Sequence, residues 1–173
     1  MILVDANVVI ASYHVAASII TARGSAGSDP LETVDQVWDN LLRTGTVGTV
    51  IEVVKEVDKP PAERWQAIVK NHRRAVLQPF EEYYLIVREL ADWVYENFEE
   101  QHAADFLRGA DPHLIAMAVA DGHSIATLET MMPQPRNGKT GKFEGRVRLP
   151  FVAWHYGVPV KTFYDLFTAP ARR

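Results

Sequence analysis

The chain has 173 residues, of which 47% are hydrophobic and 23% are charged, a balance that is ordinary for one globular domain with its own core. It contains no cysteine, which excludes a disulfide scaffold and thiolate metal sites and is compatible with a reducing compartment. The net charge of −4 lacks the basic excess that nucleic-acid-binding domains usually carry.

A short apolar run, Ile2-Leu3-Val4, opens the chain and is stopped by Asp5. Such a run is typical of a buried parallel strand, and ligands bind outside the carboxyl ends of strands in open α/β sheets. Asp5 therefore occupies a place where chemistry is expected. Because Asp5 interrupts the run, it does not resemble a signal peptide, and no other run approaches the roughly 20 apolar residues that span a membrane. We expect a cytoplasmic protein without a membrane partner.

Helical and strand patterns alternate after Asp5. Residues 8–22 are small and apolar without proline, which favours a helix, and a turn-rich break follows at residues 24–30. The next helix is predicted at residues 31–43, where apolar residues recur at the spacing of one buried face. A strand at residues 46–50 and a helix at residues 51–57 complete this part.

A helical segment is predicted from about residue 60 to residue 108, after the break at Pro60-Pro61. The polar stretch at residues 99–109 has a less certain pattern. Asp111 is a favourable N-cap residue, with Pro112 in the first turn of the helix that it opens. In this part of the chain, helices are predicted at residues 62–75, 82–98 and 112–120.

The C-terminal part contains a basic loop at residues 131–146, which is rich in Pro, Gly and Lys and is expected to be mobile. Strands are predicted around this loop at residues 124–128, 146–149 and 158–162, with helices at residues 150–155 and from residue 164 to a frayed tail. Strands that alternate with helices predict an α/β fold with a mainly parallel sheet covered on both faces, in a single domain over residues 1–173.

Four acids stand out by their positions. Asp5 ends the first strand, Asp111 opens a helix, Glu129 follows the strand at residues 124–128, and Glu56 lies in the helix after the second strand. In a doubly wound sheet, strand C-termini and the helix N-termini that follow them lie at one edge, so the first three should converge.

Packed carboxylates repel one another unless a cation or protons neutralise them. Oxygen ligands without cysteine suit Mg²⁺ or Mn²⁺, which can activate water and stabilise the charge that develops during phosphodiester cleavage. These residue types therefore predict metal-assisted hydrolysis of a phosphate ester.

Each acid also has a structural interpretation. Asp5 and Asp111 are suited to capping the helices that follow them, and Glu129 suits an exposed strand end. Glu52 is an alternative to Glu56 in the same helix. Three scattered histidines lack metal-ligand spacing and are expected to be structural or surface residues: His113, His123 and His155.

The ordered set of motifs resembles the PIN-domain proteins over nearly the whole chain. The segments that carry this resemblance are Leu3-Val4-Asp5-Ala6-Asn7, Val53-Val54-Lys55-Glu56-Val57, Ala110-Asp111-Pro112-His113-Leu114-Ile115-Ala116-Met117-Ala118 and Ile125-Ala126-Thr127-Leu128-Glu129. The tail, with Val147-Arg148-Leu149-Pro150-Phe151-Val152 and Tyr156-Gly157-Val158-Pro159-Val160, resembles an uncharacterised bacterial and archaeal branch related to VapC-type toxins.

The resemblance implies a three-layer α/β/α sandwich and a divalent-metal nuclease that acts on RNA. It assigns metal binding and catalysis to four acids: Asp5, Glu56, Asp111 and Glu129. Asn7 and Thr127 match polar positions that support the metal ligands. Glu129 stands where many members have Asp, which leaves open whether it contacts the metal directly or through water.

Residues 131–148 carry five basic side chains against Glu144 alone, a local charge of 5 − 1 = +4. A second basic group comprises Lys70, His72, Arg73 and Arg74. Either group could contact phosphates or simply be a solvated surface. The predicted substrate-binding residues are Lys139, Lys142, Arg146 and Arg148.

The sequence thus predicts a Mg²⁺- or Mn²⁺-dependent endoribonuclease, plausibly the toxin of a toxin–antitoxin pair. Its expected partners are RNA, an antitoxin protein and, by family analogy, a second copy in a homodimer. The alternative is a non-catalytic PIN-like protein that binds RNA or forms a complex. A phosphatase of the haloacid dehalogenase type is disfavoured because Asn7 occupies the place of the second acid which that chemistry needs.

Overall fold

The computed structural model describes residues 1–23 and 29–168. Within this part of the chain, a parallel sheet of five strands has the order β3-β2-β1-β4-β5. The strands are β1 (Ile2–Val4), β2 (Val47–Val50), β3 (Val76–Leu77), β4 (Ser124–Ala126) and β5 (Val160–Lys161).

The centre of the sheet is the pair β1–β4, in which Leu3 lies opposite Ile125 and Val4 opposite Ala126. All residues of β1 are buried, as expected for a parallel strand that is covered on both faces. The chain first extends the sheet from β1 toward β3 and then returns to place β4 on the other side of β1. This reversal between β1 and β4 is a topological switch point, where open α/β sheets bind their ligands.

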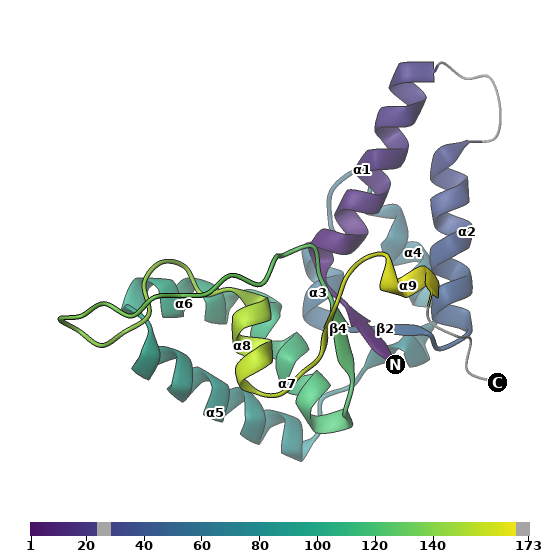
Figure 1. Cartoon of the computed structure of the whole chain (residues 1–173). Helices are drawn as coiled ribbons and strands as arrows, with labels where there is room; N and C mark the ends of the chain where they lie inside the picture. Colours follow the sequence, from purple (N-terminus) through teal and green to yellow (C-terminus); the bar gives the residue numbers. More distant parts are fainter. Residues whose placement is uncertain (24–28, 169–173) are drawn as a thin grey trace.

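The helices of the first half form one layer, in which α1 contacts α2 and α3, and α2 packs on α4 and β2. Helices α1 and α2 continue beyond the sheet as a long hairpin (Figure 1). Helix α2 buries Trp38, Leu41 and Leu42 on one face, and the Asp29 side chain caps its first turn. The helices are α1 (Ala6–Arg23), α2 (Pro30–Arg43), α3 (Ile51–Glu56) and α4 (Arg64–Asn71), followed by a 3-10 turn at Arg73–Ala75.

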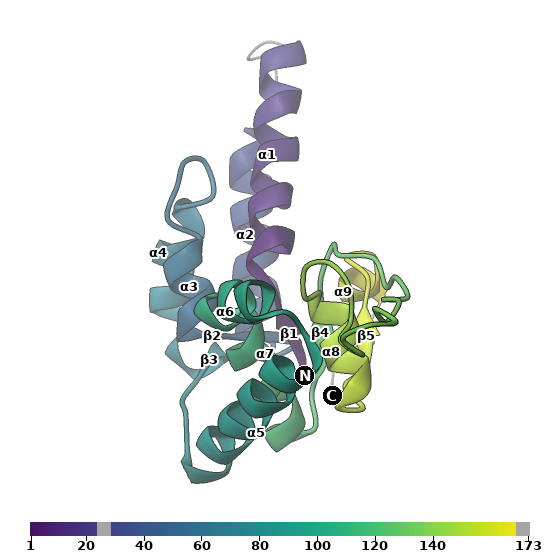
Figure 2. The ribbon, with the colours of Figure 1, turned by 90° about the vertical axis from the view of Figure 1, so that its left-hand side faces the viewer.

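The second layer is centred on α7, which contacts β2 and β4 and is covered by α5, α6 and α8. Residues Leu114 through Ala118 are all buried, so α7 is enclosed on every side and its N-terminus is fixed next to the sheet. Figure 2 shows this layer, with α5, α6 and α7 turned toward the viewer. Its helices are α5 (Glu81–Asn97), α6 (Glu100–Arg108), α7 (Asp111–Asp121) and α8 (Leu149–His155), and α9 (Asp165–Thr168) ends the described part.

The predicted fold class is therefore confirmed: the protein is a three-layer α/β/α sandwich around a parallel sheet. The strand predicted at residues 146–149 is wrong, because α8 already begins at Leu149 and only its N-cap residue Arg148 is extended. Pro150 lacks an N–H group, and this suits the first turn of a helix. The less certain stretch at residues 99–109 forms α6.

Two expectations lie outside the described residues: most of the break at residues 24–30, and the end of the C-terminal tail. Among the helices of the described part, none combines the length and the apolar character that crossing a membrane requires.

Candidate active site

Asp5 lies between β1 and α1, directly at the switch point of the sheet. It is 5% exposed, and its Oδ2 atom accepts a hydrogen bond from Thr127 Oγ1 at 2.7 Å. The backbone N–H of Asn7 also donates to the Asp5 carboxyl group, which thereby caps α1. Burial raises the pKa of Asp5 to about 6, and the negative charges of Glu129 and Glu56 contribute to the rise.

The Thr127 hydroxyl holds Asp5 through a hydrogen-bond network whose directions are fixed. The backbone N–H of Leu128 donates to Asn7 Oδ1 at 3.0 Å, so Asn7 Nδ2 must be the atom that donates to Thr127 Oγ1 at 3.2 Å. The N–H of Glu129 donates to the same hydroxyl at 3.1 Å. Because both acceptor positions of Thr127 are used, its hydrogen is directed to Asp5. The end of β4 thus orients the carboxyl group at the end of β1.

Asp111 is the first residue of α7, and Ala110 is the N-cap residue. The N-cap role predicted for Asp111 is therefore wrong. The acceptor for the first turn comes from another helix, since Glu56 Oε1 accepts a hydrogen bond from the Ala110 N–H at 2.7 Å. Glu56 thereby fixes the start of α7, and the Asp111 carboxyl group is left without a capping role.

The Asp111 carboxyl group is strongly perturbed. The pKa of Asp111 is raised to about 8, chiefly by burial and then by the carboxylates of Asp5, Glu129 and Glu56, in that order. The positive charge of Arg146 acts in the opposite direction. The three acids that we expected to converge at the sheet edge, Asp5, Asp111 and Glu129, therefore lie close enough to interact, and Glu56 joins them.

The structure separates the two candidate acids of α3. Glu56 lines a cavity together with Asp111 and contacts the start of α7. Glu52 instead acts on Tyr83 of α5, where its charge, after burial, raises the pKa of the phenol to about 12. Glu56 is thus the acid of α3 that joins the other predicted acids.

Both carboxylate oxygens of Glu129 are engaged by the end of the basic loop. Oε1 accepts a hydrogen bond from Arg146 Nη2 at 2.9 Å, and Oε2 accepts one from the backbone N–H of Leu149 at 3.2 Å. The interaction with Leu149 joins the segment that follows β4 to the first turn of α8. Glu129 therefore holds the Arg146 guanidinium beside the acids.

A cavity of about 270 Å³ lies at this place, and three of the four predicted acids line it, namely Glu56, Asp111 and Glu129. The cavity is also lined by Arg146 and Val147. Asp5 is not part of the lining, although its charge is felt by Asp111. The cavity therefore combines a carboxylate-rich wall with one cation.

Helix α6 and the residue after it also line the cavity, which the sequence reasoning missed. His102, Asp105, Phe106 and Gly109 all line the cavity. Their spacing of i, i+3, i+4 and i+7 is that of one helix face and is readable in the sequence. The many polar residues between positions 99 and 109 obscured this helical spacing.

The acids fit a divalent cation in donor type and in charge. Carboxylate oxygens are the ligands that Mg²⁺ and Mn²⁺ prefer, and burial, together with the neighbouring acids, raises the pKa values of Asp5 and Asp111. Across residues 1–23 and 29–168, however, no three Asp, Glu or His side chains are arranged to hold one ion. Glu56 and Glu129 bond to protein groups, so coordination by more than two acids requires side-chain rotation.

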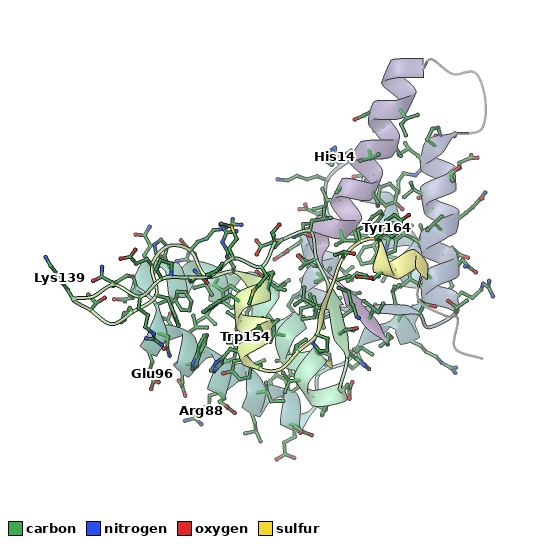
Figure 3. All side chains as sticks on the ribbon, in the orientation of Figure 1. His14, Arg88, Glu96, Lys139, Trp154 and Tyr164 are labelled. Atoms are coloured by element: carbon green, nitrogen blue, oxygen red, sulfur yellow. The ribbon has the colours of Figure 1, made fainter. Side chains whose placement is uncertain are left out.

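The four predicted substrate-binding cations have different surroundings. Lys142 Nζ donates to the backbone carbonyl of Phe98 at 2.8 Å and so binds the chain just after α5. Lys139 lies at the outer tip of the loop (Figure 3), and Arg146 contacts Glu129. Arg148 is half-buried at the start of α8. Only Arg146 of this group lines the cavity.

Comparison with known families gives one match, to a family described as a domain of unknown function (DUF4411), over residues 3–172. No curated protein matches the chain. No solved structure matches it either.

Proposed function

This chain belongs to the DUF4411 family, and we propose that it is a divalent-metal-dependent endoribonuclease that hydrolyses RNA phosphodiester bonds. The observation that carries this proposal is the electrostatic coupling of four carboxyl groups at the switch point of a parallel sheet. Acids with strongly raised pKa values beside a cavity are candidates for a functional site.

Asp5 and Asp111 are the proposed metal ligands, because their raised pKa values reflect charge that protein groups leave unbalanced. A bound Mg²⁺ or Mn²⁺ ion would activate water and stabilise the charge that develops on the phosphate. Thr127 keeps the Asp5 carboxyl group in one orientation. Arg146, which shares the cavity, is placed to attract a phosphate of the substrate.

Glu56 and Glu129 have a second role beside their charge. Glu56 fixes the start of α7, and Glu129 holds Arg146 at the cavity. The resemblance to PIN-domain nucleases supports direct or water-mediated metal contact by both acids. It also supports a cytoplasmic toxin with a neighbouring antitoxin.

The test compares the wild-type protein with Asp5→Asn on single-stranded RNA, with Mn²⁺ and with EDTA. We expect cleavage by the wild type with Mn²⁺ only, and at least about a hundredfold slower cleavage by Asp5→Asn, as when one group that stabilises transition-state charge is removed. Equal cleavage by both proteins contradicts the proposal.

One observation favours a second candidate, a non-catalytic protein that binds RNA or forms a complex. Among the described residues, the acids do not stand in a complete ligand set, and three of them, Asp5, Glu56 and Glu129, accept hydrogen bonds from protein groups. This candidate expects RNA or partner binding that survives Asp5→Asn and no heat of Mn²⁺ binding in calorimetry. Calorimetric Mn²⁺ binding that Asp111→Asn abolishes rejects it.

A further inference from the structure

His102 lines the same cavity as the acids but comes from a different element, α6. Its side chain is half-buried, and within the described residues it has neither a hydrogen-bond partner nor an ion-pair partner. His14 is exposed on the projecting helix α1 (Figure 3). The remaining histidines have partners: His72 with Asp39, His113 with Tyr83, His123 with Asp121 and His155 with Trp93. His102 thus differs from the other five in facing a cavity without a partner.

The surroundings of His102 suit a flat, partly apolar group. The cavity lining includes two apolar side chains, Phe106 and Val147, each 7% exposed. It also includes the planar cation of Arg146. Unpaired nucleobases stack on aromatic rings and on guanidinium planes and form hydrogen bonds along their edges. An imidazole offers both a ring face and an N–H donor.

A metal-ligand role for His102 is not supported, because no three Asp, Glu or His side chains of the described part are arranged to hold one ion. The size of the cavity also limits what can enter. At about 270 Å³ it is just below the roughly 300–1,000 Å³ that is usual for ligand pockets, which leaves room for one nucleotide-sized group and not for a duplex.

We propose that His102 contacts the nucleobase next to the scissile phosphate and so determines which base is preferred at the cleavage site. The inference rests on the proposed ribonuclease function, since the acids across the cavity would hold the phosphate. Asp105 lies one turn further along the same face of α6 and bonds to Arg108 at 3.0 Å, so it is less available to a base than His102.

The experiment uses His102→Ala and His102→Gln in the full chain, with Gln101→Ala as the control, because Gln101 is the exposed neighbour on the same helix. RNA with a randomised single-stranded segment is cleaved with Mn²⁺, and the new ends are sequenced. We expect the base preference to flatten in His102→Ala and to change in His102→Gln, which keeps an N–H donor but loses the ring, while Gln101→Ala cleaves like the wild type.

A second measurement does not need cleavage. The affinity for a fluorescent single-stranded RNA is measured by anisotropy in the Asp5→Asn background with Ca²⁺. We expect His102→Ala to weaken binding about tenfold, the size of one lost base contact, and Gln101→Ala to leave it unchanged. Thermal melting checks that each variant is folded.

The outcomes separate this inference from the proposed function. If the wild type cleaves RNA but His102→Ala matches Gln101→Ala in base preference and affinity, the role of His102 is overturned and the nuclease stands. If the wild type binds RNA without cleaving it, the proposed nuclease function is rejected. The affinity of His102→Ala for RNA then decides alone whether His102 contacts a base. If the wild type binds no single-stranded RNA, both are overturned.

Discussion

The carboxylate wall of the cavity and the side formed by α6 are built in different ways. Asp111 lines the carboxylate wall at the start of an enclosed helix, and Asp5, which acts on Asp111 through its charge, is held at the end of β1 by the Thr127 network. Helix α6 contributes His102, which has no partner among the described residues, and Arg146 comes from the end of a loop. The sheet thus fixes the groups proposed for the chemistry, whereas the groups proposed for substrate contact come from elements that can vary without disturbing it.

The largest effect is expected at the carboxylate wall. Asp111→Asn should slow RNA cleavage with Mn²⁺ at least about a hundredfold, because it removes a proposed metal ligand from a buried position. Asp121→Asn is the matched control, since Asp121 is exposed at the other end of the same helix. RNA cleavage rates are compared in a gel-based assay. Similar rates for Asp111→Asn and Asp121→Asn would contradict a specific role for the acid that lines the cavity.

A smaller effect is expected from the group that orients Asp5. Thr127→Val keeps the shape of the side chain but removes the donor to Asp5 and the acceptor for Asn7 and Glu129. It should lower the free energy of unfolding by about 1–3 kcal/mol and the cleavage rate about tenfold or more. Thr127→Ser keeps the hydroxyl and should retain most of the activity. Urea denaturation measures the free energy of unfolding, and initial rates measure cleavage. A Thr127→Ser variant that cleaves as slowly as Thr127→Val would contradict the hydrogen-bond explanation.

The carboxylate wall should also make the metal-free protein less stable as the pH rises. The folded-state pKa values of Asp5, about 6, and Asp111, about 8, both exceed the ordinary 3.8. The folded protein therefore holds these protons more tightly than the unfolded chain, and their contribution to stability is complete below pH 4 and is lost as the pH rises toward 8.

Asp111→Asn removes most of the stability loss that the wild type shows as the pH rises. At pH 8 the metal-free variant should therefore be more stable than the wild type by at least about 1 kcal/mol. Urea denaturation with EDTA at several pH values measures the difference. A wild type that is as stable as the variant at pH 8 would contradict the unbalanced-charge account. With Mn²⁺ added, the order should reverse, because the ion stabilises only the protein that binds it.

The smallest effects distinguish two lysines of the basic loop. Lys142→Ala should lower the free energy of unfolding by about 1 kcal/mol, because it removes a charged donor from the carbonyls of Phe98 and Tyr95. Lys139→Ala, at the loop tip, should leave stability unchanged and weaken RNA binding slightly through one lost phosphate contact. Thermal melting measures the stability of both variants, and anisotropy at two salt concentrations measures their RNA binding. A loss of stability in Lys139→Ala would contradict the different roles given to the two lysines.

Much of this fold could be predicted because local patterns decide it. The apolar run before Asp5 and the 3.6-residue periodicity of α2 and α5 are visible in the sequence, and both correspond to buried faces. Gly122 ends α7 with a φ of +65°, as the Asp-Gly pair suggested. Two short elements escaped this reasoning. Strand β3 has only two residues, and α6 is too polar to show a clear buried face before its neighbours are known.

The sequence by itself determined most of the elements and the place of Asp5 directly after the first strand, because strand and helix periods are local properties of the chain. Only the tertiary structure decided which acid of α3 faces the cavity, since Glu52 and Glu56 lie in the same short helix and are equally plausible until α7 packs against one of them.

The tertiary structure also decided that Lys142 binds the end of α5, that Arg146 is held by Glu129, and that His102 lines the same cavity as the acids. These contacts join residues that are distant in sequence, and their partners are set by packing between layers rather than by any local pattern.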